Sequence, residues 1–257
     1  MSEQNEVLKL NSQTICDLLN GAPCEVEVFD IIDSTNLEAK RRAASLNKSP
    51  KLILAEQQTA GKGRMGRQFY SPRATGLYMS YVYTPETDFS DNVTVTAAAA
   101  VAVVRAIERT TQLNPQIKWV NDIYINGKKV CGILTEAVTG QKTAIIVGIG
   151  INITTEHFPE EIVNTADSLN TAVDRNRLAA EIVLELQTLI KELPNRTFID
   201  DYRQKSCVLG REVTFIKNGT EQNGTACDID LDGGLIIKTI DGTVTLNTGE
   251  ISLRLKR

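Results

Sequence analysis

Hydrophobic and polar residues alternate along several short stretches of the chain, which is the pattern of strands with one buried face. Two longer stretches have helical character instead. The first, from Thr94 to Thr111, is rich in Ala and Val and too long for a strand, and the second opens at Asp174 and continues through Leu193. The predicted strands span residues 26–32, 51–56, 76–83, 116–119, 122–126, 129–138 and 143–153, and two further helical stretches span 34–46 and a short patch ending near 205.

Turn signals between these stretches predict how the strands pair. Asn126-Gly127 and Thr139-Gly140 each separate two predicted strands, as is typical of hairpins. We therefore expect an α+β fold in which a mixed, largely antiparallel sheet packs against helices.

The pattern changes near residue 208. From Arg211 onward, short alternating stretches are separated by Asn218-Gly219, Asp232-Gly233-Gly234 and Asp241-Gly242. This spacing predicts a small barrel or meander. We place a domain boundary there, with a large domain over 1–207 and a small β domain over 208–257.

Composition excludes several classes of protein. The chain has 257 residues, of which 42% are hydrophobic and 23% charged, as in globular proteins with a sizeable core. Its net charge of −4 argues against DNA as a partner, because binding to phosphate backbones uses a basic surplus. The segment from Met1 to Asn20 lacks a signal-peptide pattern, and no apolar run reaches membrane-spanning length. We expect a cytoplasmic protein without a membrane partner.

Cysteine and histidine offer little chemistry. The five cysteines are widely spaced and form no C-x-x-C pair, so they indicate neither a disulfide framework nor a zinc site. We expect them to be buried apolar residues. The single histidine, His157, lies in an unremarkable loop, which argues against a histidine-based nucleophile or metal mechanism.

The segment from Gly61 to Arg67 combines three glycines with the cations Lys62, Arg64 and Arg67. No Asp or Glu occurs from Gln57 to Pro85, so the segment indicates an anion site. Its glycines formally match G-x-G-x-x-G, but a strand follows where the dinucleotide fold needs a helix, and the acidic residue is missing. An exposed basic hairpin without a ligand is the alternative.

A second set of motifs follows the long helix. It comprises the run from Lys118 to Asp122, then Gly132-Ile133, and then Gly148 through Asn152. Each piece alone is weak, because a lysine beside a tryptophan is usually solvated and strand glycines are often packing residues.

Together these segments resemble the biotin protein ligase family in order and approximate spacing, from about residue 30 to the C-terminus. An ordered set of motifs is more specific than any one of them. The matching motifs are Ser34-Thr35-Asn36, Glu56 through Arg64, Ser71-Pro72, Lys118-Trp119-x-Asn121-Asp122, Lys128-Lys129-x-x-Gly132-Ile133-Leu134, Gly148-x-Gly150-Ile151-Asn152 and Gly249 through Arg254.

The resemblance implies a catalytic domain like that of class II aminoacyl-tRNA synthetases, followed by a small SH3-like β-barrel. It implies that ATP adenylates biotin with release of pyrophosphate, and that biotin then passes to a lysine of a biotin carboxyl carrier domain. ATP and Mg²⁺ are implied as co-substrates, without a tightly bound cofactor, and no side chain is assigned to the metal. A homodimer that associates through the sheet stays open.

The resemblance also implies roles for individual residues. Lys118 and Arg64 are the expected catalytic residues, with Lys118 bridging the biotin carboxylate and the phosphate. Biotin contacts are implied for Ser34, Thr35, Asn36, Gln58, Lys62, Gly63, Arg64, Lys118 and Gly132. ATP or adenylate contacts are implied for Arg67, Phe69, Asn121, Asn152 and Arg254.

The chain departs from the family pattern at three positions. Lys62 and Met65 stand where arginines are common, and Val120 stands where the family usually has proline. Lysine cannot reproduce the bidentate contact of a guanidinium, so adenylate affinity can differ.

Three alternatives remain beside the ligase. A lipoate or octanoate transfer enzyme would share the catalytic architecture. A biotin-sensing DNA-binding regulator is disfavoured, because only about 25 residues precede the first core strand, too few for a winged helix. A non-catalytic biotin binder is disfavoured by the retained Lys118 and Arg254.

Overall fold

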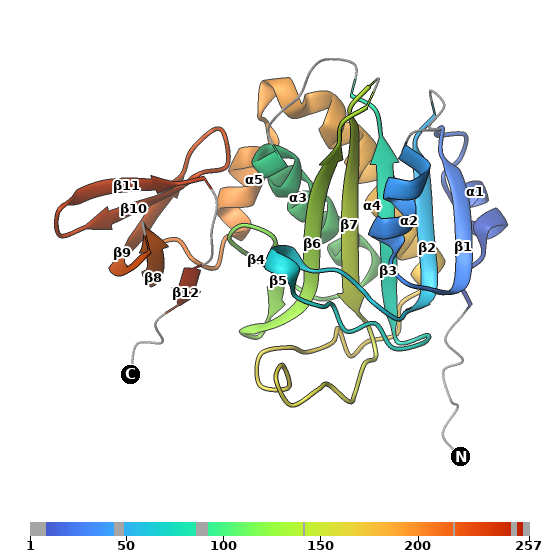
Figure 1. Ribbon diagram of the computed structural model, residues 1–257, viewed down its shortest axis with the longest axis horizontal. Coiled ribbons are helices and arrows are strands. Elements are labelled where there is room, and N and C mark those ends of the chain that lie inside the picture. The colour runs from blue at the N-terminus through green and yellow to red at the C-terminus, as the bar shows by residue number, and fades with distance from the viewer. Residues whose placement is uncertain are drawn as a thin grey trace.

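The computed structural model describes residues 9–43, 49–85, 92–140, 142–217 and 219–247, and the backbone of 251–253. Its strands form two sheets, shown in Figure 1: a seven-stranded sheet in the order β1-β2-β3-β7-β6-β5-β4, and a five-stranded sheet in the order β11-β10-β9-β8-β12. The elements are α1 (Ser12–Leu18), β1 (Glu25–Ile32), α2 (Thr35–Ala43), β2 (Lys51–Gln58), η1 (Arg64–Gly66), β3 (Gly76–Tyr83), α3 (Asn92–Thr110), β4 (Gln116–Lys118), β5 (Asp122–Ile125), β6 (Lys128–Val138), β7 (Ala144–Asn152), α4 (Arg175–Glu192), η2 (Leu193–Asn195), α5 (Phe198–Lys205), β8 (Glu212–Lys217), β9 (Thr220–Ile229), β10 (Leu235–Thr239), β11 (Gly242–Leu246) and β12 (Ile251–Leu253).

The large sheet confirms the predicted mixed, largely antiparallel arrangement. Only β1 and β2 pair in parallel, and the other neighbouring strands of this sheet are antiparallel. Helix α2 lies on the near face in Figure 1, and α3 and α4 lie on the far face. Because both faces are covered, every residue of the central strands β3 and β7 is buried, which explains their apolar runs.

Helix α3 is the long buried helix expected from the Ala/Val-rich stretch. It lies between the sheet and α4, and its alanines from Ala97 to Ala100 are at most 1% exposed. Small side chains allow the close approach of a helix that is covered on most sides.

One short helix was not anticipated. Helix α1 begins after Asn11, whose Oδ1 accepts a 2.9 Å hydrogen bond from the Thr14 backbone N–H, and Ile15 on it is fully buried. Seven residues carry too few apolar positions to reveal a helical period. At the other short helix, α2, the predicted end at Leu46 lies outside the described residues.

The C-terminal strands form the small antiparallel sheet that the turn signals predicted. Within the described residues its outer strands, β11 and β12, do not pair with each other, so the expected SH3-like barrel is not closed there. This sheet is joined to the large one by the Trp119 indole, which donates a 2.9 Å hydrogen bond to the Gly233 carbonyl. Thr94, at the start of α3, donates to the Asp232 carbonyl at 3.3 Å.

The cysteine prediction was only partly right. Cys131 and Cys207 are buried, Cys16 and Cys24 are half-buried, and Cys227 on β9 is exposed, all as free thiols. Burial raises the pKa of the Cys24 thiol to about 12. Among the described residues, no three His, Cys, Asp or Glu side chains are grouped to hold a metal, and no helix there is long and apolar enough to cross a membrane.

Candidate functional site

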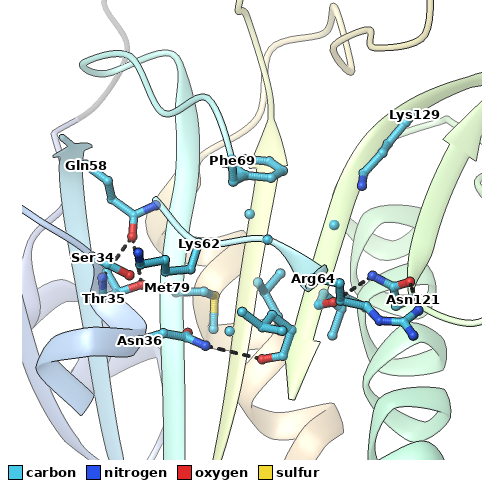
Figure 2. Close-up of a pocket in the computed structure, with 17 residues that line it drawn as sticks. Ser34, Thr35, Asn36, Gln58, Lys62, Arg64, Phe69, Met79, Asn121 and Lys129 are labelled. Atoms are coloured by element: carbon cyan, nitrogen blue, oxygen red, sulfur yellow. Dashed lines mark hydrogen bonds between the residues drawn. The ribbon is translucent and has the colours of Figure 1, made fainter. Parts of the chain in front are cut away.

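A pocket of about 440 Å³ opens on the α2 face of the large sheet, between the start of α2, the glycine-rich loop and strands β3, β7 and β6. Figure 2 shows Ser34, Thr35 and Gln58 at one end and Arg64, Asn121 and Lys129 at the other. The pocket brings together the following residues singled out from the sequence: Ser34, Thr35, Asn36, Gln58, Lys62, Gly63, Arg64, Phe69, Asn121 and Gly132.

The glycine-rich loop after β2 folds back on itself as a narrow hairpin. Phe69 N–H donates to the Gly61 carbonyl at 3.0 Å, and Gly63 N–H donates to the Arg67 carbonyl at 2.8 Å. A Cβ atom on Gly61 would lie 2.5 Å from the Phe69 carbonyl oxygen, so only glycine fits there. Gly66 has a φ of +76°, which favours glycine at the tip. The hairpin therefore holds Lys62 and Arg64 at the pocket.

The first end of the pocket is polar and hydrogen-bonded. The Gln58 Oε1 atom accepts from the backbone N–H of Thr35 at 2.8 Å and from its hydroxyl at 3.2 Å. The Gln58 amide nitrogen donates to the Ser71 hydroxyl at 2.9 Å. Ser34, Thr35 and Asn36 are buried and present neutral donors and acceptors in a fixed arrangement, and Figure 2 shows the Lys62 side chain beside them.

Asn36 occupies space that a glycine of β7 leaves open. Its Oδ1 accepts from the Ser80 hydroxyl at 2.6 Å, and its amide nitrogen donates to Glu136 at 3.0 Å. A Cβ atom on Gly148 would lie 2.0 Å from the Asn36 Oδ1. Gly148 is therefore a steric requirement of the pocket floor.

The run from Lys118 to Asp122 connects the second end of the pocket to its surroundings. Asn121 Oδ1 accepts from Arg64 Nη1 at 2.9 Å, and Asn121 Nδ2 donates to the Ile133 carbonyl at 2.8 Å. The Asp122 carboxylate lies 2.7 Å from the Lys129 ammonium nitrogen. The Trp119–Val120 peptide bond within this run is cis.

Of the two lysines that the resemblance placed at the site, Lys62 lines the pocket and Lys118 does not. Lys118 lies on β4, the outermost strand of the sheet, and its Nζ is 3.4 Å from the Tyr124 hydroxyl, above the Tyr124 ring. Lys129, at the start of β6, lines the pocket instead. The available signal was Lys128-Lys129-x-x-Gly132, because two residues separate Lys129 from a pocket glycine.

Phe69 lies over the glycines of β6 and β7. A Cβ atom on Gly150 would approach the Phe69 ring to 2.5 Å, and one on Gly132 would approach it to 3.4 Å. The ring also meets Tyr78 edge to face at a centroid distance of 6.4 Å. Burial raises the pKa of Tyr78 to about 12, so its hydroxyl stays protonated and donates to the Pro72 carbonyl at 2.9 Å.

The remaining expected residues lie outside the pocket lining or outside the described chain. Asn152, at the end of β7, is buried and donates to the Asp167 carbonyl at 3.0 Å, while no described residue hydrogen-bonds to its Oδ1. Arg67 is exposed on the hairpin. Arg254 and the Gly249-Glu250 part of its motif lie outside the described residues. His157 is exposed and lines no part of the pocket.

Comparison with known proteins agrees with the family resemblance seen in the sequence. Residues 28–152 match the model of the biotin/lipoate A/B protein ligase family, and residues 208–254 match the biotin protein ligase C-terminal domain. The bifunctional ligase/repressor BirA of Bacillus spizizenii is 34% identical, over 87% of this chain and 72% of that protein. The biotin--[acetyl-CoA-carboxylase] ligase of Mycobacterium tuberculosis is 30% identical, over 94% and 95%. The structure of the Aquifex aeolicus biotin protein ligase in complex with biotin and ATP is similar, with a TM-score of 0.77 at 29% identity, over 90% of this chain and 99% of that one.

Proposed function

The chain belongs to the biotin protein ligase family, and from that premise we propose how its residues catalyse ATP-dependent biotinylation. Biotin and ATP give biotinyl-adenylate and pyrophosphate, and the biotinyl group then passes to an acceptor lysine. The observation that carries the assignment is that eight of the nine residues expected to contact biotin line one pocket, Lys118 being the exception.

The polar end of the pocket suits the ureido ring of biotin. That ring has two N–H donors and one carbonyl acceptor and carries no charge, so it needs neutral partners. Ser34, Thr35 and Gln58 supply them, and the hydrogen bonds between Thr35 and Gln58 hold these two side chains in place before the ligand arrives. Met79 and Ile149 add apolar walls for the rest of the ligand.

The cationic end suits the carboxylate and the α-phosphate. Two anions approach each other only when fixed positive charge offsets their repulsion. Arg64 and Lys129 line this end of the pocket and supply that charge, whereas Lys62 lies at the other end, beside Gln58 (Figure 2). We assign to Lys129 the bridging role that the sequence suggested for Lys118, because the Asp122 carboxylate at 2.7 Å holds the Lys129 ammonium at the pocket.

ATP would lie along the Phe69 side. The ring over Gly132 and Gly150 offers a flat apolar surface for adenine, and the Asn152 Oδ1 can accept from an adenine amino group. Arg67 and Arg254 are proposed to contact the phosphates. Mg²⁺ would enter as a co-substrate with the ATP phosphates, where it adds positive charge.

The proposed acceptor is the lysine of a biotin carboxyl carrier domain. No general base is needed to ionise biotin, because its carboxylate is charged at neutral pH. Positioning and charge stabilisation then account for the transfer.

The homodimer considered from the sequence stays a prediction that sedimentation of the purified chain would test. The division near residue 208 is likewise a proposal, and limited proteolysis between Ser206 and Arg211 would test it.

The runner-up substrate is lipoate or octanoate, since the family model over residues 28–152 covers both kinds of ligase. Mass spectrometry decides between them after incubation with ATP, Mg²⁺ and either biotin or lipoate, with and without a carrier domain. Biotinyl-adenylate alone, and one biotinylated lysine when the carrier is present, are the expected products. Adenylate with lipoate only would overturn the substrate assignment.

A further inference from the structure

A second pocket, of about 450 Å³, adjoins the first at Arg64, Ile133 and Leu134, which line both. It lies where β6 extends beyond its neighbour β5, because β5 pairs with β6 only as far as Gly132. Two elements close its other sides. The start of α3 contributes Val93 and Thr96. The C-terminal sheet contributes Asn247, the residue that follows β11.

The chemistry of the second pocket differs from that of the first. Val93, Val120 and Ile133 make its walls apolar. The hydroxyls of Thr96 and Thr135 bond to each other at 2.9 Å and are its central polar groups. Among its described lining residues, Arg64 is the single charged side chain, and it sits at the junction with the first pocket.

This lining is unsuited to the anionic substrates. Pyrophosphate and the ATP phosphates need several cations, and Lys62 and Lys129 lie in the first pocket. A lysine side chain fits the second pocket better. Its four methylene groups pack on apolar walls. Because no carboxylate is among the described lining residues, burial favours the neutral amine, which is the nucleophilic form.

We propose that the second pocket admits the side chain of the acceptor lysine and leads its amine to the biotinyl-adenylate beside Arg64. The proposal rests on the proposed function and adds the route of the second substrate. The amine nitrogen attacks the acyl carbon, so a C–N bond forms and the C–O bond to AMP breaks. The electron pair of that bond leaves with the phosphate oxygen of AMP, and the surplus proton of the nitrogen passes to solvent.

Thr135→Phe tests the route by filling the pocket from β6, where an aromatic residue suits a strand. The matched control is Ala137→Phe, two residues along the same face of β6, at an exposed position outside both pockets. Thr135 is half-buried, so a large residue there can also disturb folding. Asn247→Trp is therefore a second blocking variant, at an exposed position on the other wall of the pocket.

Two half-reactions are measured separately for each variant. Pyrophosphate release with biotin and ATP reports adenylation, and single-turnover transfer from preformed biotinyl-adenylate to a carrier domain reports use of the acceptor. We expect both blocking variants to slow transfer on the order of 100-fold while adenylation stays close to wild type. Ala137→Phe should change neither rate.

Normal transfer in both blocking variants would overturn the route. Loss of adenylation in both would also overturn it, because the pocket would then serve the first half-reaction. Failure of the proposed function looks different, since the unaltered protein would then form no biotinyl-adenylate at all.

Discussion

Arg64 donates a 2.9 Å hydrogen bond to Asn121, and this contact ties the glycine-rich hairpin to the turn between β4 and β5. Asn121 is itself held by the Ile133 carbonyl on β6 at 2.8 Å. The hairpin therefore closes onto a rigid part of the sheet at the point where the two pockets meet. A charged hydrogen bond at this position can hold the loop over a reactive intermediate and shield it from water.

Arg64→Gly should release biotinyl-adenylate from the pocket, because the hairpin loses both the charge that we propose to face the phosphate and its contact with Asn121. We expect dissociation of the adenylate to be on the order of tenfold faster or more, since a charged hydrogen bond contributes about 1.5–3 kcal/mol. Free adenylate reacts with amines without selection. Mass spectrometry of a bystander protein should therefore show many biotinylated lysines, and unchanged acceptor selectivity would refute the prediction. Asn121→Ala should also speed the dissociation of the adenylate, but by a smaller factor.

Lys129→Ala should lower the rate of adenylate formation by about 10²–10³-fold, because a fixed charge at the reacting anions is removed. Lys118→Ala is the matched comparison, since it removes the same charge from β4, outside the pocket lining. It should leave the rate within about threefold of wild type. Pyrophosphate release at saturating biotin and ATP measures both. Equal losses in the two variants would contradict the assignment to Lys129.

Gly148→Ala should weaken biotin binding and destabilise the fold by about 1–3 kcal/mol, because the new methyl group overlaps the Asn36 amide. Adding Asn36→Ala removes the overlapping atoms. The double variant should recover most of the lost stability in urea unfolding but not the KM for biotin. Recovery of neither would mean that the strand backbone, and not Asn36, is what Gly148 accommodates.

Glu56→Ala should destabilise the protein by about 3–5 kcal/mol, because it leaves a buried guanidinium without its carboxylate. Glu56 and Arg175 pair at 2.7 Å with side chains only 3% and 1% exposed, and the Glu56 carboxylate also accepts from the Leu10 backbone N–H at 2.8 Å. Asp200→Ala breaks the exposed pair with Arg203 and should cost less than about 1 kcal/mol. Urea unfolding compares the two, and equal costs would contradict the dependence on burial.

Acidification should loosen the start of α2, which carries the polar end of the pocket. The Arg41 guanidinium, helped by the Ser34 backbone N–H, holds the pKa of Asp33 below its ordinary value of 3.8. A carboxyl whose pKa is lowered by folding stabilises the protein above its ordinary pKa and loses that contribution as pH falls through the folded value. Asp33→Asn should therefore be less stable than wild type at pH 7. The difference should vanish in thermal unfolding at strongly acidic pH, and a constant difference would rule out the charge as its source.

Local pattern predicted much of the fold because local physics produces it. Strand β3 has the bounds expected from its alternation, and α3 differs from the predicted stretch by one or two residues at each end. The hairpin at Asn126-Gly127 has positive φ at both residues, which the Asn-Gly pair accommodates at low cost. Helix α1 was not predicted because its buried side rests on residues that are distant in the sequence. The exposure of Cys227 was not predicted because the composition of a strand does not show which of its faces meets solvent.

The sequence alone indicated a loop of glycines and cations before β3, because residue type and spacing show it, whereas the neutral residues expected at the site came from the resemblance of the ordered motifs to a known family. Only the tertiary structure showed that Lys129, and not Lys118, lines the pocket. Lys118 and Lys129 sit in adjacent motifs, but β4 is the outer edge of the sheet whereas the pocket lies over β6 and β7. The same holds for Gly148 and Gly150, whose missing side chains are replaced by Asn36 and Phe69 from elements far away in the chain. Strand order and long-range packing are set by the burial of the whole core, and no single motif contains them.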